Sequence, residues 1–341
     1  MSNEPKQRSK IDDELPVKPK APVALLDDLL TSWSPDDPVL SSAEDSCALQ
    51  EGCPVNSCAG KGYILTAEGS TIQAKLCPCV LDCPECVGQG FTHNLSSGRS
   101  QFCIPIPPQK IVALYSDSHL PRRYLHASLD GEKGGFRNFS GNADRVLTQL
   151  KDYVASFPSK FLPQKSLSYD PKGLILSGPV GVGKTFLLVS LAKKFIAKGY
   201  QVKFVDFFRL IAEIQGGLSN KESPIRILDP LIDVEILLID ELGKGRNSEF
   251  ESTILDQIIM GRYNQNKPII ATTNYSLTQP SYQKSVNLKS SHNSFSPDYF
   301  GSLKDRVGSR IFSRLFESCR MVALQGNDYR KMIQNTPHHD V

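Results

Sequence analysis

Residues 178–185 read GPVGVGKT, and this stretch decides the fold class of the chain. It is a glycine-rich turn that ends in a lysine and a threonine, and it lies between an apolar run at 173–178 and an amphipathic run that begins at Lys184. Between a strand and a helix, such a turn points backbone N–H groups at phosphate oxygens. The sequence therefore predicts a phosphate-binding loop formed by Gly178, Pro179, Val180, Gly181, Val182, Gly183, Lys184 and Thr185.

Strand and helix signals alternate along the rest of the chain. The run from Lys184 to Gly199 predicts a helix, and residues 248–264 predict another that begins with a capping box of Ser248 and Glu251. Short apolar runs predict further strands at 201–207, 235–241, 268–274 and 320–324. Such alternation is typical of a parallel sheet with helices on both faces. We expect a three-layer α/β protein, with one strand inserted between the phosphate-loop strand and the acidic strand.

Polar residues follow two of these strands at their carboxyl ends, the edge at which α/β sheets bind ligands. Lys184 is expected to reach the β- and γ-phosphates of ATP, and Thr185 and Asp240 to hold Mg²⁺. Glu241 would orient or deprotonate the attacking water, and Asn274 would hydrogen-bond the γ-phosphate or that water. A nucleotide kinase would need basic lid residues and not this acidic pair, so the pattern favours hydrolysis of ATP.

Eight of the nine cysteines lie between residues 47 and 103. Two similar stretches, CPVNSCAGKGY and CPECVGQGF, each carry a cysteine pair before two glycines, and another cysteine follows each pair. Crowded thiols in a chain without an export signal favour structural Zn²⁺ over disulfides. One set is Cys53, Cys58, Cys77 and Cys79; Cys83, Cys86 and Cys103 need a fourth ligand, for which Cys47 and His93 are available. One zinc ion or two both fit this pattern.

Charge and composition divide the chain into three parts. Residues 1–45 are proline-rich and hold five Lys/Arg against ten Asp/Glu, which predicts a disordered acidic tail. We assign 46–110 to a cysteine-rich zinc module and 111–341 to the ATPase domain. No run of about 18 apolar residues suggests a membrane span, so we expect a cytoplasmic protein. Basic or aromatic side chains beside the acidic strand either track a single nucleic-acid strand or form an ordinary solvated surface: Lys244, Arg246, Arg262 and Tyr263.

Several of these motifs resemble the AAA+ replicative-helicase loaders of the DnaC and DnaI type and their IstB-type transposition-helper relatives. They are the phosphate loop, LLIDELG at 237–243, TTN at 272–274, and RVGSRIFSRLFESC and GNDYR at 306–319 and 326–330. The resemblance covers roughly residues 111–335. It implies an ATP-dependent protein that assembles with neighbouring subunits, contacts single-stranded DNA and delivers a ring helicase.

In that family an arginine of the SRL motif completes the ATP site of the neighbouring subunit, and Arg314 holds this position here. Arg310 lies one turn earlier on the same predicted helix and is the second candidate. Only about 27 residues follow Arg314, which leaves no room for the helical lid of many AAA+ proteins. The expected fold is thus an AAA+ domain without a lid.

The cysteine block resembles the zinc region of DnaJ chaperones, although four residues separate the first pair where two are usual. Zinc modules also precede the ATPase of DnaI-type loaders, where the amino-terminal region holds the helicase. Two alternative functions would use the same ATPase domain. One is a transposition helper that remodels target DNA, and the other is an interaction protein whose zinc module binds a partner under nucleotide control.

Overall fold

The computed structural model describes residues 58, 61–81, 91–94, 99–102, 108–130, 141–157, 172–221, 223–246, 248–277 and 301–330, with side chains placed for all of these except 81, 91–94 and 99–102. The predicted acidic tail at 1–45 and the Ser/Asn-rich stretch at 281–300 lie outside these residues.

A parallel sheet of five strands forms the centre of the described chain, in the order β6-β7-β8-β5-β9. Strand β8 pairs with both β5 and β7, so the predicted inserted strand is confirmed. All five strands are short. The inner strands β7, β8 and β5 are buried at every residue, because helices cover both sides, whereas the edge strands β6 and β9 are partly exposed. The strands are β5 (Gly173–Ser177), β6 (Val202–Asp206), β7 (Ile236–Asp240), β8 (Ile269–Thr273) and β9 (Cys319–Ala323).

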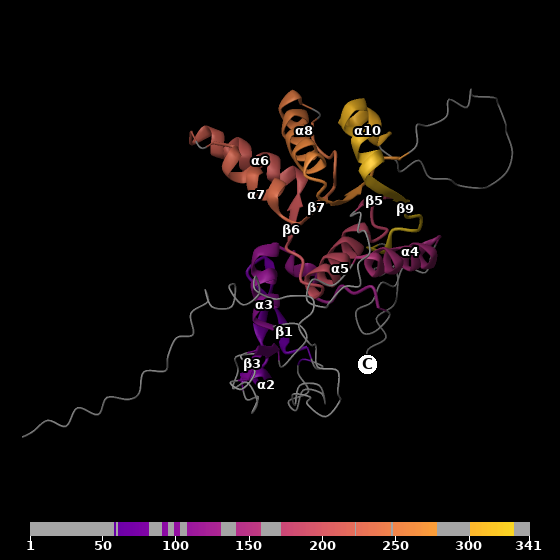
Figure 1. Cartoon of the computed structure of the whole chain (residues 1–341). Helices are drawn as coiled ribbons and strands as arrows, with labels where there is room; N and C mark the ends of the chain where they lie inside the picture. Colours follow the sequence, from indigo (N-terminus) through magenta and orange to yellow (C-terminus); the bar gives the residue numbers. More distant parts are fainter. Residues whose placement is uncertain are drawn as a thin grey trace, which may run out of the picture. The chain divides into compact units, whose positions relative to one another are not determined.

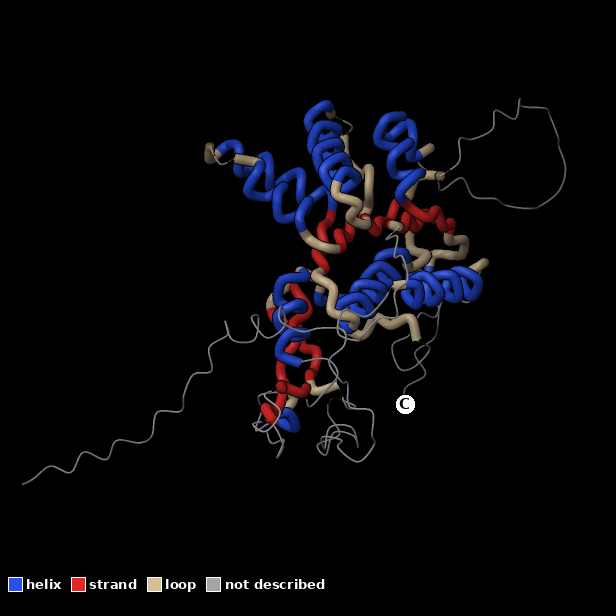
Figure 2. The backbone as a smooth tube through the Cα atoms, viewed as in Figure 1, coloured by secondary structure: helices blue, strands red, loops and turns tan. Residues whose placement is uncertain are grey.

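Helices cover both faces of this sheet (Figures 1 and 2). Side chains alternate across a strand, so Leu174 and Leu176 face one hydrophobic cluster while Ile175 faces the other. The first cluster is formed with α3 (Pro108–Ser118), α4 (Ala143–Ser156) and α5 (Lys184–Ala197). The second is formed with α6 (Phe207–Ser219), α7 (Ile225–Asp233), α8 (Glu249–Asn264), α9 (Leu303–Val307) and α10 (Ser309–Ser318). The capping box of Ser248 and Glu251 is present at the start of α8, as predicted.

Two antiparallel hairpins precede this domain. The first joins β1 (Tyr63–Glu68) to β2 (Thr71–Leu76) and is followed by α2 (Pro78–Leu81); the second joins β3 (Phe91–Asn94) to β4 (Arg99–Phe102). Ile72 of β2 is fully buried in the same cluster as Leu150 and Leu174. Helix α3 packs on β2 and runs across the boundary predicted between 110 and 111. That boundary stays a prediction, and the described hairpin shares the hydrophobic core of the sheet.

Hydrogen bonds strengthen this connection. The Ile72 amide donates to Leu120 O at 2.7 Å, and the Arg122 amide at the start of η1 (Arg122–Tyr124) donates to Ser70 O at 2.9 Å. Lys193 of α5 donates to Leu125 O at 2.5 Å and to a second carbonyl two residues later at 3.0 Å. Burial lowers the pKa of Lys193 to about 8. Helix α5, which follows the phosphate loop, is thus hydrogen-bonded to the segment 120–127, and that segment is hydrogen-bonded to the β1–β2 hairpin.

Arg262 of α8 is fully buried and ties α7 and β7 to the start of β8. Its guanidinium donates at 2.7–3.0 Å to the backbone carbonyls of Leu231, Ile232, Val234, Glu235 and Pro268. Burial lowers the pKa of Arg262 to about 9, which leaves the group charged at neutral pH. A side chain with no exposed surface cannot contact DNA, so the nucleic-acid interpretation of Arg262 was wrong.

Within the described part of the chain, no helix has the length and apolar character that crossing a bilayer requires.

Candidate functional site

The glycine loop connects β5 to α5, as predicted, and its glycines adopt backbone angles that other residues avoid. Gly181 has φ of 83° and Gly183, which immediately precedes α5, has φ of 101°. A Cβ at Gly181 would also lie 1.9 Å from Oδ1 of Asp328, in the segment after β9. Left-handed backbone and a close neighbour therefore both require glycine at position 181.

Lys184 lies at the start of α5 and is only 7% exposed. Its ammonium donates to Gly178 O at 2.7 Å and Pro179 O at 2.6 Å, so it is held within the loop. Burial lowers its pKa to about 8, against the opposing influence of Asp240 and Glu241. A poorly hydrated ammonium in this position is well prepared to bind an anion, since phosphate oxygens are stronger acceptors than peptide carbonyls.

Asp240 ends β7 and is only 7% exposed. It accepts hydrogen bonds from the hydroxyl of Thr185 at 3.0 Å and that of Thr272 at 2.5 Å. Burial raises the pKa of Asp240, and these two hydrogen bonds act in the opposite direction. A threonine hydroxyl beside a carboxylate is a suitable oxygen donor set for Mg²⁺. The residues present therefore fit the predicted metal.

Thr272 was missed in the sequence, where it is the first threonine of TTN. The register pairs Ile239 with Ala271, so the next residues along, Asp240 and Thr272, lie opposite each other. If β7 and β8 are assumed to be parallel neighbours and their apolar runs are aligned, the residues that directly follow the two runs lie opposite each other. The contact between Asp240 and Thr272 could therefore have been predicted from the sequence.

Glu241 leaves the strand direction directly after Asp240. It has φ of 56°, a left-handed conformation that costs about 1–2 kcal/mol for a residue with a side chain. Its amide donates to Thr272 Oγ1 at 3.0 Å, and its carboxylate forms an ion pair with Lys244. The hydrogen bond that the Lys244 ammonium donates to the Glu241 carboxylate raises the pKa of Lys244. Lys244, a predicted DNA contact, thus also serves as the partner of the predicted catalytic carboxylate.

Asn274 directly follows β8 and is half-buried. The register pairs Ser177 with Thr273, and the Gly178 amide donates to Thr273 O at 3.2 Å. The residue therefore lies at the same sheet edge as the phosphate loop. The predicted ATP-site residues thus share one edge of the sheet: Lys184, Thr185, Asp240, Glu241 and Asn274. Their chemical roles stay predictions.

Arg314 and Arg310 are on α10, which packs on the opposite face of the sheet from α5. Arg310 pairs with Asp256 of α8 at 2.5 Å, and the Arg314 guanidinium lies 5.6 Å from the centre of the Tyr263 ring. Both arginines therefore contact α8 and not the phosphate loop of their own chain. The action of Arg314 on a neighbouring subunit stays a prediction.

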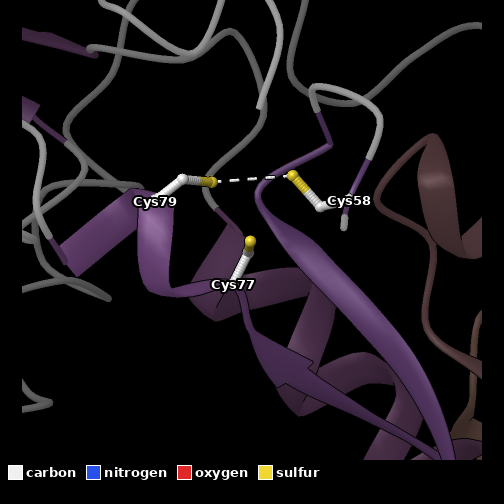
Figure 3. Close-up of side chains that lie close together, drawn as sticks. All are labelled: Cys58, Cys77 and Cys79. Carbon is white, nitrogen blue, oxygen red and sulfur yellow. Dashed lines mark hydrogen bonds between the residues drawn. The ribbon is translucent and has the colours of Figure 1, made fainter. Parts of the chain in front are cut away.

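Three of the predicted zinc ligands meet in one buried cluster, Cys58, Cys77 and Cys79 (Figure 3). Their sulfur atoms all lie within 4.8 Å of one another, and those of Cys58 and Cys79 are 3.6 Å apart. Tetrahedral Zn²⁺ with Zn–S bonds of about 2.3 Å would separate its sulfurs by about 3.8 Å. The Gly62 amide donates to Cys58 Sγ at 3.4 Å, which fixes the position of that sulfur within the cluster.

The other predicted and candidate zinc ligands have no described side chain. Cys47, Cys53, Cys83, Cys86 and Cys103 lie outside the described residues, and the side chain of His93 does too. The fourth ligand of the cluster and the number of ions therefore stay predictions.

The family model described as IstB-like ATP binding protein matches residues 160–336, just over half of the 341 residues. The chain belongs to this family. Because the IstB-like region includes the phosphate loop and all five sheet strands, the predicted family relationship is confirmed. The order β6-β7-β8-β5-β9, with the phosphate loop after β5, makes this region an AAA+ module, as predicted.

Curated relatives of this IstB-like chain include two kinds of protein. The replicative helicase loader DnaC of Escherichia coli K12 is 26% identical over 135 residues, 39% of this chain and 51% of DnaC. An ATP-binding protein of insertion sequence IS5376 from Geobacillus stearothermophilus is 32% identical over 110 residues, 31% of this chain and 41% of the relative. The chain therefore aligns with about half the length of these relatives.

Solved structures similar to this IstB-like chain include a DnaC helicase loader, with a TM-score of 0.45 and 26% identity over 60% of this chain and 99% of the other. The DnaI structure gives 0.43 and 21% over 60% of this chain and 95% of the other. These scores are below 0.5, so the fold assignment rests on the strand order.

Proposed function

We propose that this chain hydrolyses ATP at the edge of its sheet and uses the energy to load a ring helicase onto single-stranded DNA. The observation that carries the proposal is the joining of Thr185 to Asp240 by hydrogen bonds of 3.0 Å, beside the buried ammonium of Lys184. One site thereby offers the three groups that bind a magnesium triphosphate: a cation, a hydroxyl and a carboxylate.

Each residue of the site has its own role in the proposed hydrolysis of ATP. Backbone amides of the glycine loop and the Lys184 ammonium bind the phosphates, while Thr185 and Asp240 hold Mg²⁺, which neutralises charge on the phosphate oxygens. Glu241 accepts a proton from the attacking water, and its ion pair with Lys244 holds the carboxylate in place. Asn274 orients the water or the γ-phosphate from the end of β8.

Arg314 supplies the missing positive charge to the neighbouring subunit. Its contacts on its own chain are weak: a ring at 5.6 Å and a carbonyl at 3.4 Å. A guanidinium so loosely held can turn toward a neighbour's phosphates at little cost. Self-assembly of the ATPase domain would thus be required for full hydrolysis.

The relatives support two uses for this ATPase. DnaC is described as a replicative helicase loader, and other relatives are described as ATP-binding proteins of insertion sequences. The cysteine-rich region ahead of the sheet favours the loader, since it gives the chain a second surface for binding a protein partner in the cytoplasm. The second candidate is a transposition helper, which a transposase gene beside this one would favour.

Capture of the host's ring helicase tests the loader. The tagged chain should retain the purified helicase in the presence of Mg-ATP, and single-stranded DNA should stimulate its ATP hydrolysis. Lys184→Ala is the matched control, because it should lose the dependence of capture on ATP. If a transposase is retained and the helicase is not, the transposition helper is correct. If neither protein is retained, the result favours the third alternative, an interaction protein whose zinc module binds a partner under nucleotide control.

We also propose that Cys58, Cys77 and Cys79 hold a structural zinc ion, with Cys53 as the fourth ligand predicted from sequence. Four sulfurs leave no open position for water, so the ion would stabilise the module and take no part in hydrolysis. Its position at the base of the β1–β2 hairpin fits this role, because Cys77 directly follows β2.

Cys77→Ser should lower the zinc content of the purified protein by about one ion per chain, because the hard hydroxyl replaces a thiolate in a soft donor set. Elemental analysis after gel filtration measures it. Cys319→Ser is the control: this buried thiol on β9 lies outside the cluster, and its loss should leave the zinc content unchanged. Equal zinc in wild type and Cys77→Ser would contradict the assignment.

A further inference from the structure

The turn that follows Glu241 is bonded to strand β8 where it begins. The Leu242 amide donates to Thr272 O at 2.7 Å, and Leu242 O accepts from the hydroxyl of Thr273 at 2.9 Å. The Lys244 amide donates back to Glu241 O at 2.9 Å, which closes the turn. The first residues after the predicted catalytic carboxylate are therefore fixed by the sheet.

Arg306 holds the same turn further along the chain. This half-buried arginine lies in α9, and its guanidinium donates to the backbone carbonyls of Gly243 and Gly245. The two glycines have φ of 83° and 154°, and a Cβ at Gly243 would lie 3.0 Å from Cγ of Arg306. Among the described residues, no carboxylate forms an ion pair with Arg306. Its charge is thus directed at two carbonyls, which a charged donor holds more strongly than a neutral one.

Lys244 lies between the two carbonyls that Arg306 holds. Its ammonium forms the ion pair with the Glu241 carboxylate, so the position of that carboxylate depends on the backbone at Lys244. Glu241 itself has φ of 56°, a conformation that a residue with a side chain keeps only when its surroundings impose it. Without Arg306, the carbonyls on both sides of Lys244 would lose their charged donor, and the ion pair would lose its fixed base.

The same guanidinium contacts the segment after β8. It lies 5.7 Å from the centre of the Tyr275 ring, a distance at which a cation is attracted to an aromatic ring. Tyr275 directly follows Asn274, the residue proposed to orient the water or the γ-phosphate. The Leu303 amide at the start of α9 also donates to Ser276 O at 2.8 Å. Arg306 therefore connects the two segments that carry the proposed hydrolytic side chains.

We propose that Arg306 is a positioning residue for hydrolysis: by holding the turn after Glu241, it keeps that carboxylate aimed at the attacking water. The inference rests on the proposed ATPase function and adds a residue to it. Arg306 acts within its own chain, unlike Arg314, and its described contacts are with the turn and with Tyr275. Loss of Arg306 should therefore slow the hydrolysis of bound ATP and leave the affinity for Mg-ATP nearly unchanged.

Hydrolysis and binding, measured separately on the full chain, test this role. In Arg306→Ala, kcat for ATP should fall about 10- to 100-fold, because a misplaced general base loses much of its effect. The dissociation constant of Mg-ATP from calorimetry should stay within about twofold of wild type, which also shows that the variant is folded. Arg306→Lys should recover part of kcat, since an ammonium can donate to a carbonyl but lacks the planar fork. Lys304→Ala removes another cation of α9 and is the control, which should match wild type in both measurements.

A double-mutant cycle identifies the group through which Arg306 acts. In a Glu241→Gln background, Arg306→Ala should have little further effect on kcat, because the carboxylate that it positions is already gone. If Arg306→Ala lowers kcat by the same factor in both backgrounds, Arg306 does not act through Glu241 and the inference is wrong.

Mixed assemblies separate an action within the chain from an action between subunits. Lys184→Ala subunits carry an intact Arg306 and should restore no hydrolysis to Arg306→Ala subunits, because the defect lies in the chain that holds the ATP. Recovery in this mixture would overturn the inference. If wild type hydrolyses ATP and Arg306→Ala has the same kcat, the inference fails and the proposed function stands. If wild type does not hydrolyse ATP, the proposed function fails and the inference falls with it.

Discussion

Replacing Lys184 with alanine is expected to weaken the binding of Mg-ATP by at least about a hundredfold. The ammonium would make two charge-assisted hydrogen bonds to the phosphates, each worth about 1.5–3 kcal/mol, and every 1.4 kcal/mol is about a factor of ten in affinity. No other described lysine lies in the glycine loop, so none can take its place. Isothermal titration of the folded variant with Mg-ATP measures the loss.

Lys194→Ala provides the matched control. This lysine lies ten residues further along α5, and its partner is the exposed carboxylate of Asp130 at 2.6 Å. Exposed ion pairs contribute little to stability, so the control should keep its fold and its affinity for ATP. Equal affinities of Lys184→Ala and wild type would remove this loop as the nucleotide site.

The affinity of wild type should also depend on pH. Burial lowers the pKa of Lys184 to about 8, so the side chain is increasingly neutral above that pH, whereas bound phosphates favour its charged form. Binding above pH 8 must therefore take up a proton, and the affinity should fall as pH rises, by up to about tenfold per unit. The dependence should disappear in Lys184→Ala, which identifies its source.

Arg262→Met is expected to reduce the free energy of unfolding by about 3–5 kcal/mol. Methionine fills much of the space but donates nothing, so five backbone carbonyls that now accept from the guanidinium lose their partner in a buried place. In a domain of about 200 residues this corresponds to a fall in melting temperature of about 10 °C. Thermal unfolding followed by circular dichroism measures it.

Arg145→Met serves as the control, because the same exchange on the exposed face of α4 should change the melting temperature by a degree or two at most, about 0.5 kcal/mol or less. A variant of Arg262 that melts like wild type and yet binds DNA less tightly would restore the nucleic-acid interpretation of this residue.

The sheet and the phosphate site were predictable because their signals are local. Each strand is a run of about five apolar residues, and the glycine loop, Asp240 and Asn274 adjoin such runs. The role of Arg262 was hidden, because an arginine late in a helix looks like a solvated charge until the carbonyls that surround it are known. Residues 104–109 read IPIPPQ, a pattern typical of a stiff spacer, but Pro108 begins α3, since proline fits the first turn of a helix.

The fixing of the β1–β2 hairpin to the ATPase core has a mechanical consequence. Packed interiors deform little and transmit strain, so a force applied to the hairpin would be carried through Leu120 and Arg122 toward the carbonyls held by Lys193. That lysine belongs to the helix whose first turn carries Lys184 and Thr185. A force on the β1–β2 hairpin and a ligand in the glycine loop would therefore both act on helix α5, the first at Lys193 and the second at its first turn.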